Sequence, residues 1–182
     1  MSSRESDIKQ LIQDYLLDEG LLREKVSDPK LEFGFQFIFP PGKDPLGRPV
    51  GRNMLVFRPK NKGLIIVSLG VQISEPHINA LNSLEITKKM NFFMDLRKSF
   101  LLKDVFYRID IKNHRYEIID QIFLNKDEFI SKNSFFKMVR KVFNGATYSN
   151  FILDDYCAGK IKPEDFMKAK EFTSDSDFSL YS

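Results

Sequence analysis

The spacing of the hydrophobic residues changes repeatedly along the chain, and each change predicts a new element of secondary structure. Near the amino terminus the apolar residues recur every three or four positions, as on one face of a helix: Ile8, Leu11, Ile12, Tyr15 and Leu16. After Pro29 the spacing becomes two, and every second residue from 31 to 39 is Leu or Phe. This alternation predicts a strand with one apolar face, which we expect to lie under the helices.

The remaining elements follow from the same reading. We predict strands over 54–57 and 64–73, then a long helix from Glu75 to about residue 102, and a hairpin over 105–124. A bend near Asn82 and Ser83 is one option within the long helix. Its second half has one apolar stripe predicted to be buried: Ile86, Met90, Phe93, Arg97 and Phe100, the arginine included as an approximate fit.

A third long helix is predicted near the carboxyl terminus. Asn125 and Glu128 have the spacing of a capping box at its start, and Gly145 is a place where it could be interrupted. The order is therefore helix, three strands, helix, two strands, helix. We predict one α+β domain over residues 1–172, with an antiparallel sheet of about five strands covered by helices. Its core spans about 6–157, a short extra helix spans 163–172, and the Ser- and Asp-rich residues 173–182 form a disordered tail.

Three segments carry a resemblance to known proteins. They are Phe33 to Pro41, a strand closed by two prolines; Leu64 to Ser74, leading into Glu75-Pro76-His77; and Arg97 to Leu102 before the hairpin. Together they resemble an archaeal and bacterial family catalogued only as a domain of unknown function, over roughly residues 5–155. The element order resembles the type III secretion chaperone-like fold. That resemblance implies a non-enzymatic, often dimeric protein that binds polypeptide segments, and it implies no particular site residues.

Composition narrows the class of protein. The chain has 182 residues, a net charge of +3 and a single cysteine, so no internal disulfide can form. No apolar run approaches the roughly 20 residues that span a bilayer. The polar and charged residues 1–9 lack the apolar stretch of a signal peptide. We therefore expect a cytoplasmic protein that does not contact membranes.

Phenylalanine is unusually frequent. There are 18 Phe and no Trp among the 182 residues. Phenyl rings bring large apolar area without a polar atom, so the excess predicts either a thick core or a surface that a partner covers. Because two-fold association is the commonest way to cover such a surface, we predict a homodimer.

Residues 40–62 are the best local candidate for a ligand site. The segment has four prolines between 40 and 49, and Asp44 is its only acid. A loop stiffened by proline and carrying spaced cations could hold a phosphate or an acidic group. The candidate ligands are Lys43, Arg48, Arg52, Arg58 and Lys60. It is not a Walker loop, because Asp44 follows Gly42-Lys43 where Ser or Thr should stand. The competing interpretation is a solvated connection between two strands, basic for solubility.

Other reactive side chains form no recognisable motif. His77 and His114 are 37 positions apart and lack neighbouring ligand pairs, so we predict no metal and no cofactor. Cys157 is interpreted as a buried structural cysteine. Asp154 and Asp155 are adjacent, so on a helix they would point to different sides and would not act as a paired acid and base. The sequence therefore favours a non-enzymatic protein-binding or chaperone-like module. The alternative is a nucleic-acid or phosphate binder that uses residues 40–62.

Overall fold

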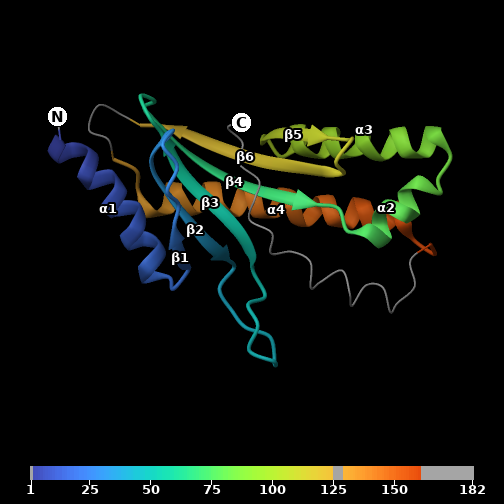
Figure 1. Ribbon diagram of the computed structural model, residues 1–182, viewed down its shortest axis with the longest axis horizontal. Coiled ribbons are helices and arrows are strands. Elements are labelled where there is room, and N and C mark those ends of the chain that lie inside the picture. The colour runs from blue at the N-terminus through green and yellow to red at the C-terminus, as the bar shows by residue number, and fades with distance from the viewer. Residues whose placement is uncertain (1, 125–128, 161–182) are drawn as a thin grey trace. The chain divides into compact units, whose positions relative to one another are not determined.

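The computed structural model describes residues 2–124 and 129–160, and Figure 1 shows how its elements follow one another. In chain order they are α1 (Ser2–Asp18), β1 (Leu22–Lys25), β2 (Leu31–Phe39), β3 (Arg52–Pro59), β4 (Leu64–Gln72), α2 (Glu75–Asn82), α3 (Ile86–Leu102), β5 (Phe106–Asp110), β6 (Arg115–Phe123) and α4 (Lys132–Cys157). The predicted α+β class is confirmed.

The strands within these two ranges form one open antiparallel sheet in the order β1-β2-β3-β4-β6-β5. It has six strands rather than the predicted five, because the short edge strand β1 was not foreseen. Three of the four residues of β1 are exposed and charged, so its sequence shows no apolar alternation. Pairing with β2 is what makes this segment a strand.

The long helix predicted from residue 75 to 102 is two helices, α2 and α3, separated at Ser83–Glu85, where the sequence allowed a bend. In contrast, the predicted interruption of the last helix at Gly145 is wrong, because α4 continues through it. A Cβ atom at Gly145 would lie 3.3 Å from Cγ2 of Ile118, so this glycine permits close packing on β6. The predicted capping box at 125–128, extra helix at 163–172 and tail at 173–182 lie outside the described residues.

The described residues divide into two compact units, called here the first unit (2–69 with 119–124 and 129–143) and the second unit (70–118 with 144–160). In the first unit the predicted phenyl face of β2 is buried, as Phe33, Phe35 and Phe37 show. Phe37 contacts Phe135 of α4, with ring centroids 6.5 Å apart, and Phe135 also contacts Tyr15 of α1. The face therefore forms the core of this unit.

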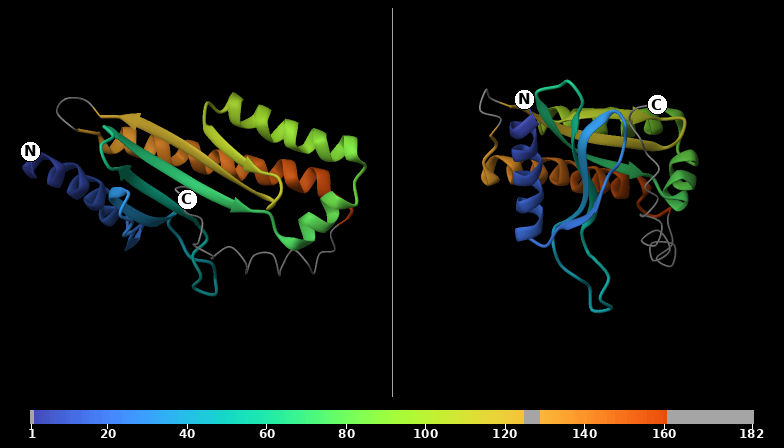
Figure 2. Two further views of the ribbon diagram at one scale, coloured as in Figure 1. Left: turned by 45° about the horizontal axis from the view of Figure 1, so that its top comes forward. Right: turned by 60° about the vertical axis from the view of Figure 1, so that its left-hand side comes forward.

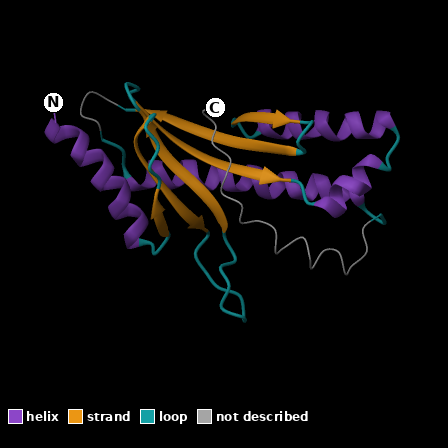
Figure 3. Cartoon of the chain, in the orientation of Figure 1, coloured by secondary structure: helices purple, strands orange, loops and turns teal. Residues whose placement is uncertain are grey.

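The core of the second unit is built on one side of α3, which runs beside β5 (Figure 3). Its buried residues are Phe92, Phe93, Leu96, Ser99 and Phe100. The ring of Phe100 lies 5.3 Å from that of Tyr107 on β5 and 5.8 Å from that of Tyr116 on β6. These contacts fix which side of α3 faces the strands.

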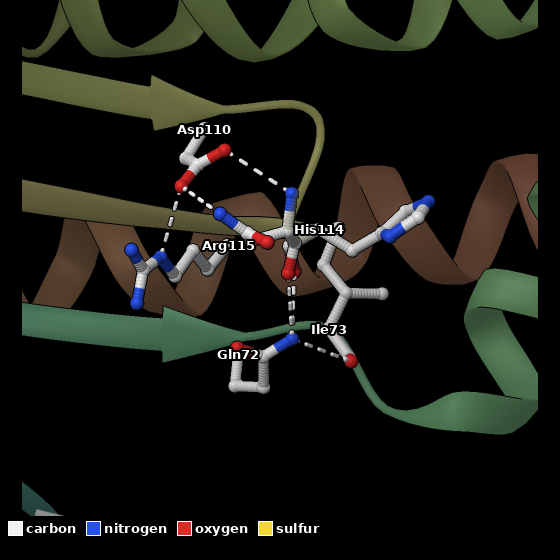
Figure 4. A network of polar contacts seen from close by, with 6 residues as sticks. Gln72, Ile73, Asp110, His114 and Arg115 are labelled. Carbon is white, nitrogen blue, oxygen red and sulfur yellow. Dashed lines mark hydrogen bonds and ion pairs between the residues drawn. The ribbon is translucent and has the colours of Figure 1, made fainter. Parts of the chain in front are cut away.

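A polar network at the β5–β6 turn completes the second unit (Figure 4). The side-chain amide of Gln72 donates to the carbonyl oxygens of Asn113 and His114, at 3.0 and 3.2 Å. Within the turn, the Asp110 carboxylate accepts hydrogen bonds from Asn113 and, at 3.1 Å, from Nε of Arg115. These bonds lower the pKa of Asp110, with the Asn113 side chain as the largest cause. The network ties the hairpin to the end of β4.

Candidate functional site

The basic loop is shorter than predicted. The sequence placed it at 40–62, but β3 occupies 52–59, so the connection between β2 and β3 spans only residues 40–51. It extends beyond the two strands as a narrow hairpin (Figure 2). An antiparallel bridge between Lys43 and Pro49 and a hydrogen bond from the Asp44 amide to the Arg48 carbonyl continue the hairpin almost to its tip. The segment is thus an ordered hairpin.

Asp44 organises the tip of this hairpin. One oxygen of its carboxylate, Oδ1, accepts hydrogen bonds from the backbone amides of Leu46 and Arg48, both at 2.9 Å. The other, Oδ2, lies 2.9 Å from Nε of the Arg48 guanidinium. The amide of Arg48 is the main cause that lowers the pKa of Asp44. The Arg48 guanidinium is therefore partly neutralised by Asp44 within the turn.

The structure spreads the five predicted ligand residues apart. Lys43 and Arg48 lie in the exposed hairpin, Arg52 is the first residue of β3, and Lys60 follows its last residue. The eight residue-to-residue steps from Arg52 to Lys60 span about 26 Å in an extended strand. Arg58 lies on β3 with its side chain only 8% exposed. One small anion cannot contact all five of these side chains.

Arg58 belongs to the core of the first unit. Its Nε lies 3.0 Å from Oε2 of Glu32 on β2 and also donates to the carbonyl oxygen of Lys62 at 3.3 Å. The glutamate side chain is 21% exposed. This ion pair joins two neighbouring strands, so Arg58 has a structural explanation that its place in the sequence did not reveal.

A Ser-His-Asp contact, which the sequence analysis missed, lies in the second unit. The imidazole of buried His77 on α2 has Ser74 Oγ 2.6 Å from Nδ1 and Asp154 Oδ1 of α4 3.2 Å from Nε2. Because a carboxylate only accepts hydrogen bonds, this arrangement favours the tautomer that carries its proton on Nε2. The Cys157 thiol lies 3.8 Å from the backbone carbonyl oxygen of His77 and donates to it.

This contact has a structural explanation. Ser74 is the N-cap of α2, yet its hydroxyl makes no bond to the helix backbone and instead contacts His77 at the third helical position. Side chains at these two positions lie close together at the start of a helix, and in a capping box each bonds to the backbone amide of the other residue. Asp154 then ties the start of α2 to the last turns of α4. Within residues 2–124 and 129–160, no group of three or more His, Cys, Asp or Glu side chains could hold a metal ion.

The Cys157 thiol is expected to react slowly. Cys157 is buried, and burial is the main cause that raises its pKa to about 11, with the Asp154 carboxylate adding to the effect. At pH 8 only about one thiol in a thousand would be ionised, and the thiolate is the nucleophile. We predict that a thiol-reactive dye labels the folded protein at pH 8 at least about 100-fold more slowly than the unfolded protein. Equal rates in the two states would show that Cys157 is accessible.

The largest departure from the sequence prediction is an exposed apolar surface on α3. Four of its apolar side chains are between 44% and 80% exposed: Ile86, Met90, Met94 and Leu101. A helix advances about 100° per residue, so these four positions fall within about 80° of one another. We call these four residues the α3 surface. The sequence placed Ile86 and Met90 in the buried stripe, which is wrong, because Phe92, Leu96 and Phe100 define the buried side.

Charges near the α3 surface are mainly positive. Arg97 falls within the same sector of the helix and is exposed, while Lys89 and Lys98 lie on its two flanks. Asp95, the only acid between residues 86 and 102, lies on another side, where it accepts a hydrogen bond from the Tyr156 hydroxyl at 2.7 Å. That bond is the main cause that lowers the pKa of Asp95. The pKa of Tyr156 is raised to about 12, mainly by burial and secondly by the hydrogen bond to the Asp95 carboxylate. Asp95 also lies 3.3 Å from Nζ of Lys98, and this exposed pair offsets part of the positive charge beside the α3 surface.

Comparison with known proteins gives a family without an assigned activity. A family model described as "Uncharacterized conserved protein (DUF2299)" matches residues 8–153. No curated protein matches the chain. One solved structure, described as the crystal structure of an uncharacterized protein from Methanothermobacter thermautotrophicus, is similar with a TM-score of 0.70 and 20% sequence identity, over 81% of this chain and 97% of that chain. At this identity the likeness concerns the fold alone.

Proposed function

This chain belongs to the DUF2299 family, whose description names no activity, and from the geometry of its second unit we propose that it is a non-catalytic protein-binding module. The observation that carries the proposal is the α3 surface. Single exposed apolar residues are ordinary, but four aligned on one side of a helix whose other side is already buried are not. Fully burying one such side chain contributes about 1.5–3 kcal/mol.

Two of the four side chains are methionines, which suits a surface that binds. Methionine is unbranched and polarizable, so it adapts to partners of different shape. The exposed apolar side chains span residues 86–101 and would lie in a row of about 22 Å on the helix. A row of this length fits the apolar anchors of a helical or extended peptide segment.

A catalytic role finds less support. The Ser74–His77–Asp154 contact is the nearest approach to a reactive constellation, and a helix cap together with a tie between α2 and α4 explains it. The proposed module is therefore a binding protein whose chemistry is recognition, and no metal or cofactor enters the proposal.

We also propose the type III secretion chaperone-like arrangement as its fold type. If α2 and α3 are counted as one interrupted helix and β1 as an added edge strand, the observed order becomes helix, three strands, helix, two strands, helix. Members of that fold bind polypeptide segments, and this analogy supports the same role.

The test is affinity capture from an extract of the source cells at about 50 and 500 mM salt. The bait is the unmodified protein, a variant with Met90→Gln and Met94→Gln, or a control with Leu46→Gln and Val50→Gln. The control residues are also apolar and exposed, but they lie in the β2–β3 hairpin. Apolar binding resists salt whereas phosphate binding does not. We expect a protein that the unmodified bait and the control retain at high salt and that the α3 variant loses. Retention of nucleic acid at low salt only would favour the hairpin instead.

Self-association is the second part of the proposal. The excess of phenylalanine suggested a homodimer, but Phe33, Phe35 and Phe37 are buried within the first unit, so a second copy would need another surface. We predict a homodimer that forms through a sheet face or α4, with a dimer mass in light scattering that persists across a hundredfold dilution, because exposed apolar area favours two-fold association. A monomer mass throughout would remove the homodimer and leave binding to other proteins as the function.

A further inference from the structure

The charges around the α3 surface restrict what can cover it. Lys89 and Lys98 flank the apolar row, and Arg97 lies within it. The ion pair of Lys98 with Asp95 is 3.3 Å long and exposed on both sides, so it neutralises little of that charge. A partner that covers the α3 surface must therefore have apolar side chains, together with negatively charged groups that can lie beside these three cations.

A second copy of α3 meets this requirement poorly. If two such helices packed antiparallel about a two-fold axis at the middle of the row, Met90 of one would face Arg97 of the other. One flank of the interface would then carry Lys89 from both copies, and the other flank would carry Lys98 from both copies. If they packed in parallel about a two-fold axis, each Arg97 would face its own copy. Like charges placed together at an interface disfavour the pairing, because neither finds a compensating acid. The basic residues on α3 thus act against self-association through this surface.

We propose that the α3 surface binds an amphipathic helical segment of another protein whose apolar side is flanked by Asp and Glu. The inference rests on the proposed function and names the class of partner. Four turns of such a helix span about 22 Å, which matches the row from Ile86 to Leu101. Carboxylates on its flanks pair with Lys89, Arg97 and Lys98, while its apolar residues pack on the two methionines.

The experiment uses the full chain and three designed 18-residue peptides with a fluorescent label. The first peptide has Leu at helical spacing flanked by Glu. The second has the same Leu positions flanked by Lys, and the third has the composition of the first with the Leu positions scrambled. At about 50 mM salt we expect the first to bind at least tenfold more tightly than either of the others. The difference from the Lys-flanked peptide should shrink as salt screens the charges.

Two variants show where and how the acidic peptide binds. Met90→Gln with Met94→Gln should weaken its binding at least tenfold, whereas Leu46→Gln with Val50→Gln should leave it unchanged. Arg97→Glu with Lys98→Glu should transfer the preference to the Lys-flanked peptide. Circular dichroism confirms that each variant keeps its helix content.

The outcomes separate the two proposals. Equal binding of the Glu- and Lys-flanked peptides, or an unchanged preference after charge reversal, would overturn the acidic partner and leave protein binding at α3 in place. Binding that does not respond to the methionine variant would overturn both. If no peptide binds, the acidic-helix inference is wrong, and the capture experiment alone decides the broader function.

Discussion

Replacing Phe35 by alanine is expected to lower the free energy of unfolding by about 3–5 kcal/mol, the usual loss when a buried phenyl ring leaves a cavity. Phe35 is fully buried on β2, where it pairs with Val56 of β3. Its ring lies 5.6 Å from that of Phe33. Urea denaturation followed by circular dichroism measures the change.

The matched control is the next residue along the same strand. Gln36 points to the other face of the sheet and is partly exposed. Gln36→Ala should therefore cost less than about 1 kcal/mol. Equal shifts of the two denaturation midpoints would mean that the buried face of β2 has been assigned wrongly.

Replacing Glu32 by alanine should destabilise the protein by about 2–3 kcal/mol. The change removes the carboxylate that lies 3.0 Å from Nε of Arg58, and the Arg58 side chain is only 8% exposed. A buried guanidinium that loses this carboxylate keeps the cost of its desolvation with one charged contact fewer to offset it. The value lies below the full range for buried pairs because Glu32 is 21% exposed. Thermal and urea unfolding of the variant provide the measurement.

A double variant separates this cause from lost packing. Glu32→Leu with Arg58→Met replaces both charges by apolar groups of similar size. If the loss of this ion pair causes the destabilisation, the double variant should recover most of the stability. A double variant as unstable as Glu32→Ala would show that the shape of the two side chains matters more than their charge.

Alternation and helical spacing predicted the parts of the fold in which one face is buried locally. Phe33, Phe35 and Phe37 alternate because only one face of β2 meets the core, and the sequence therefore revealed both the strand and its orientation. β1 was missed because its sequence has no apolar pattern. It is a strand because it pairs with β2. Gly145 of α4 was also misinterpreted for lack of its neighbours. A glycine within a helical pattern indicates a helix end, but this one permits close packing against β6.

The candidate site was less predictable because it depends on which neighbours are present. Ile86 and Met90 have the spacing of a buried stripe, and only the packing of Phe92 and Phe100 shows that a different side of α3 faces the strands. His77 and Asp154 lie 77 positions apart, so no local pattern could pair them. Arg58 falls within the predicted basic loop, because the pairing of β2 with β3, which brings Arg58 beside Glu32, is not visible in the sequence.

Among the described helices, none is long and apolar enough to cross a membrane.

The most direct test of protein binding at α3 is photo-crosslinking in the source cells. A photoreactive phenylalanine derivative replaces Met94 in one protein and Leu46 in another, two exposed apolar positions on α3 and on the β2–β3 hairpin. We predict a discrete crosslinked protein from position 94 and none from position 46, and Met90→Gln should reduce the yield at position 94. A product that forms equally at both positions, or at position 46 alone, would contradict this prediction.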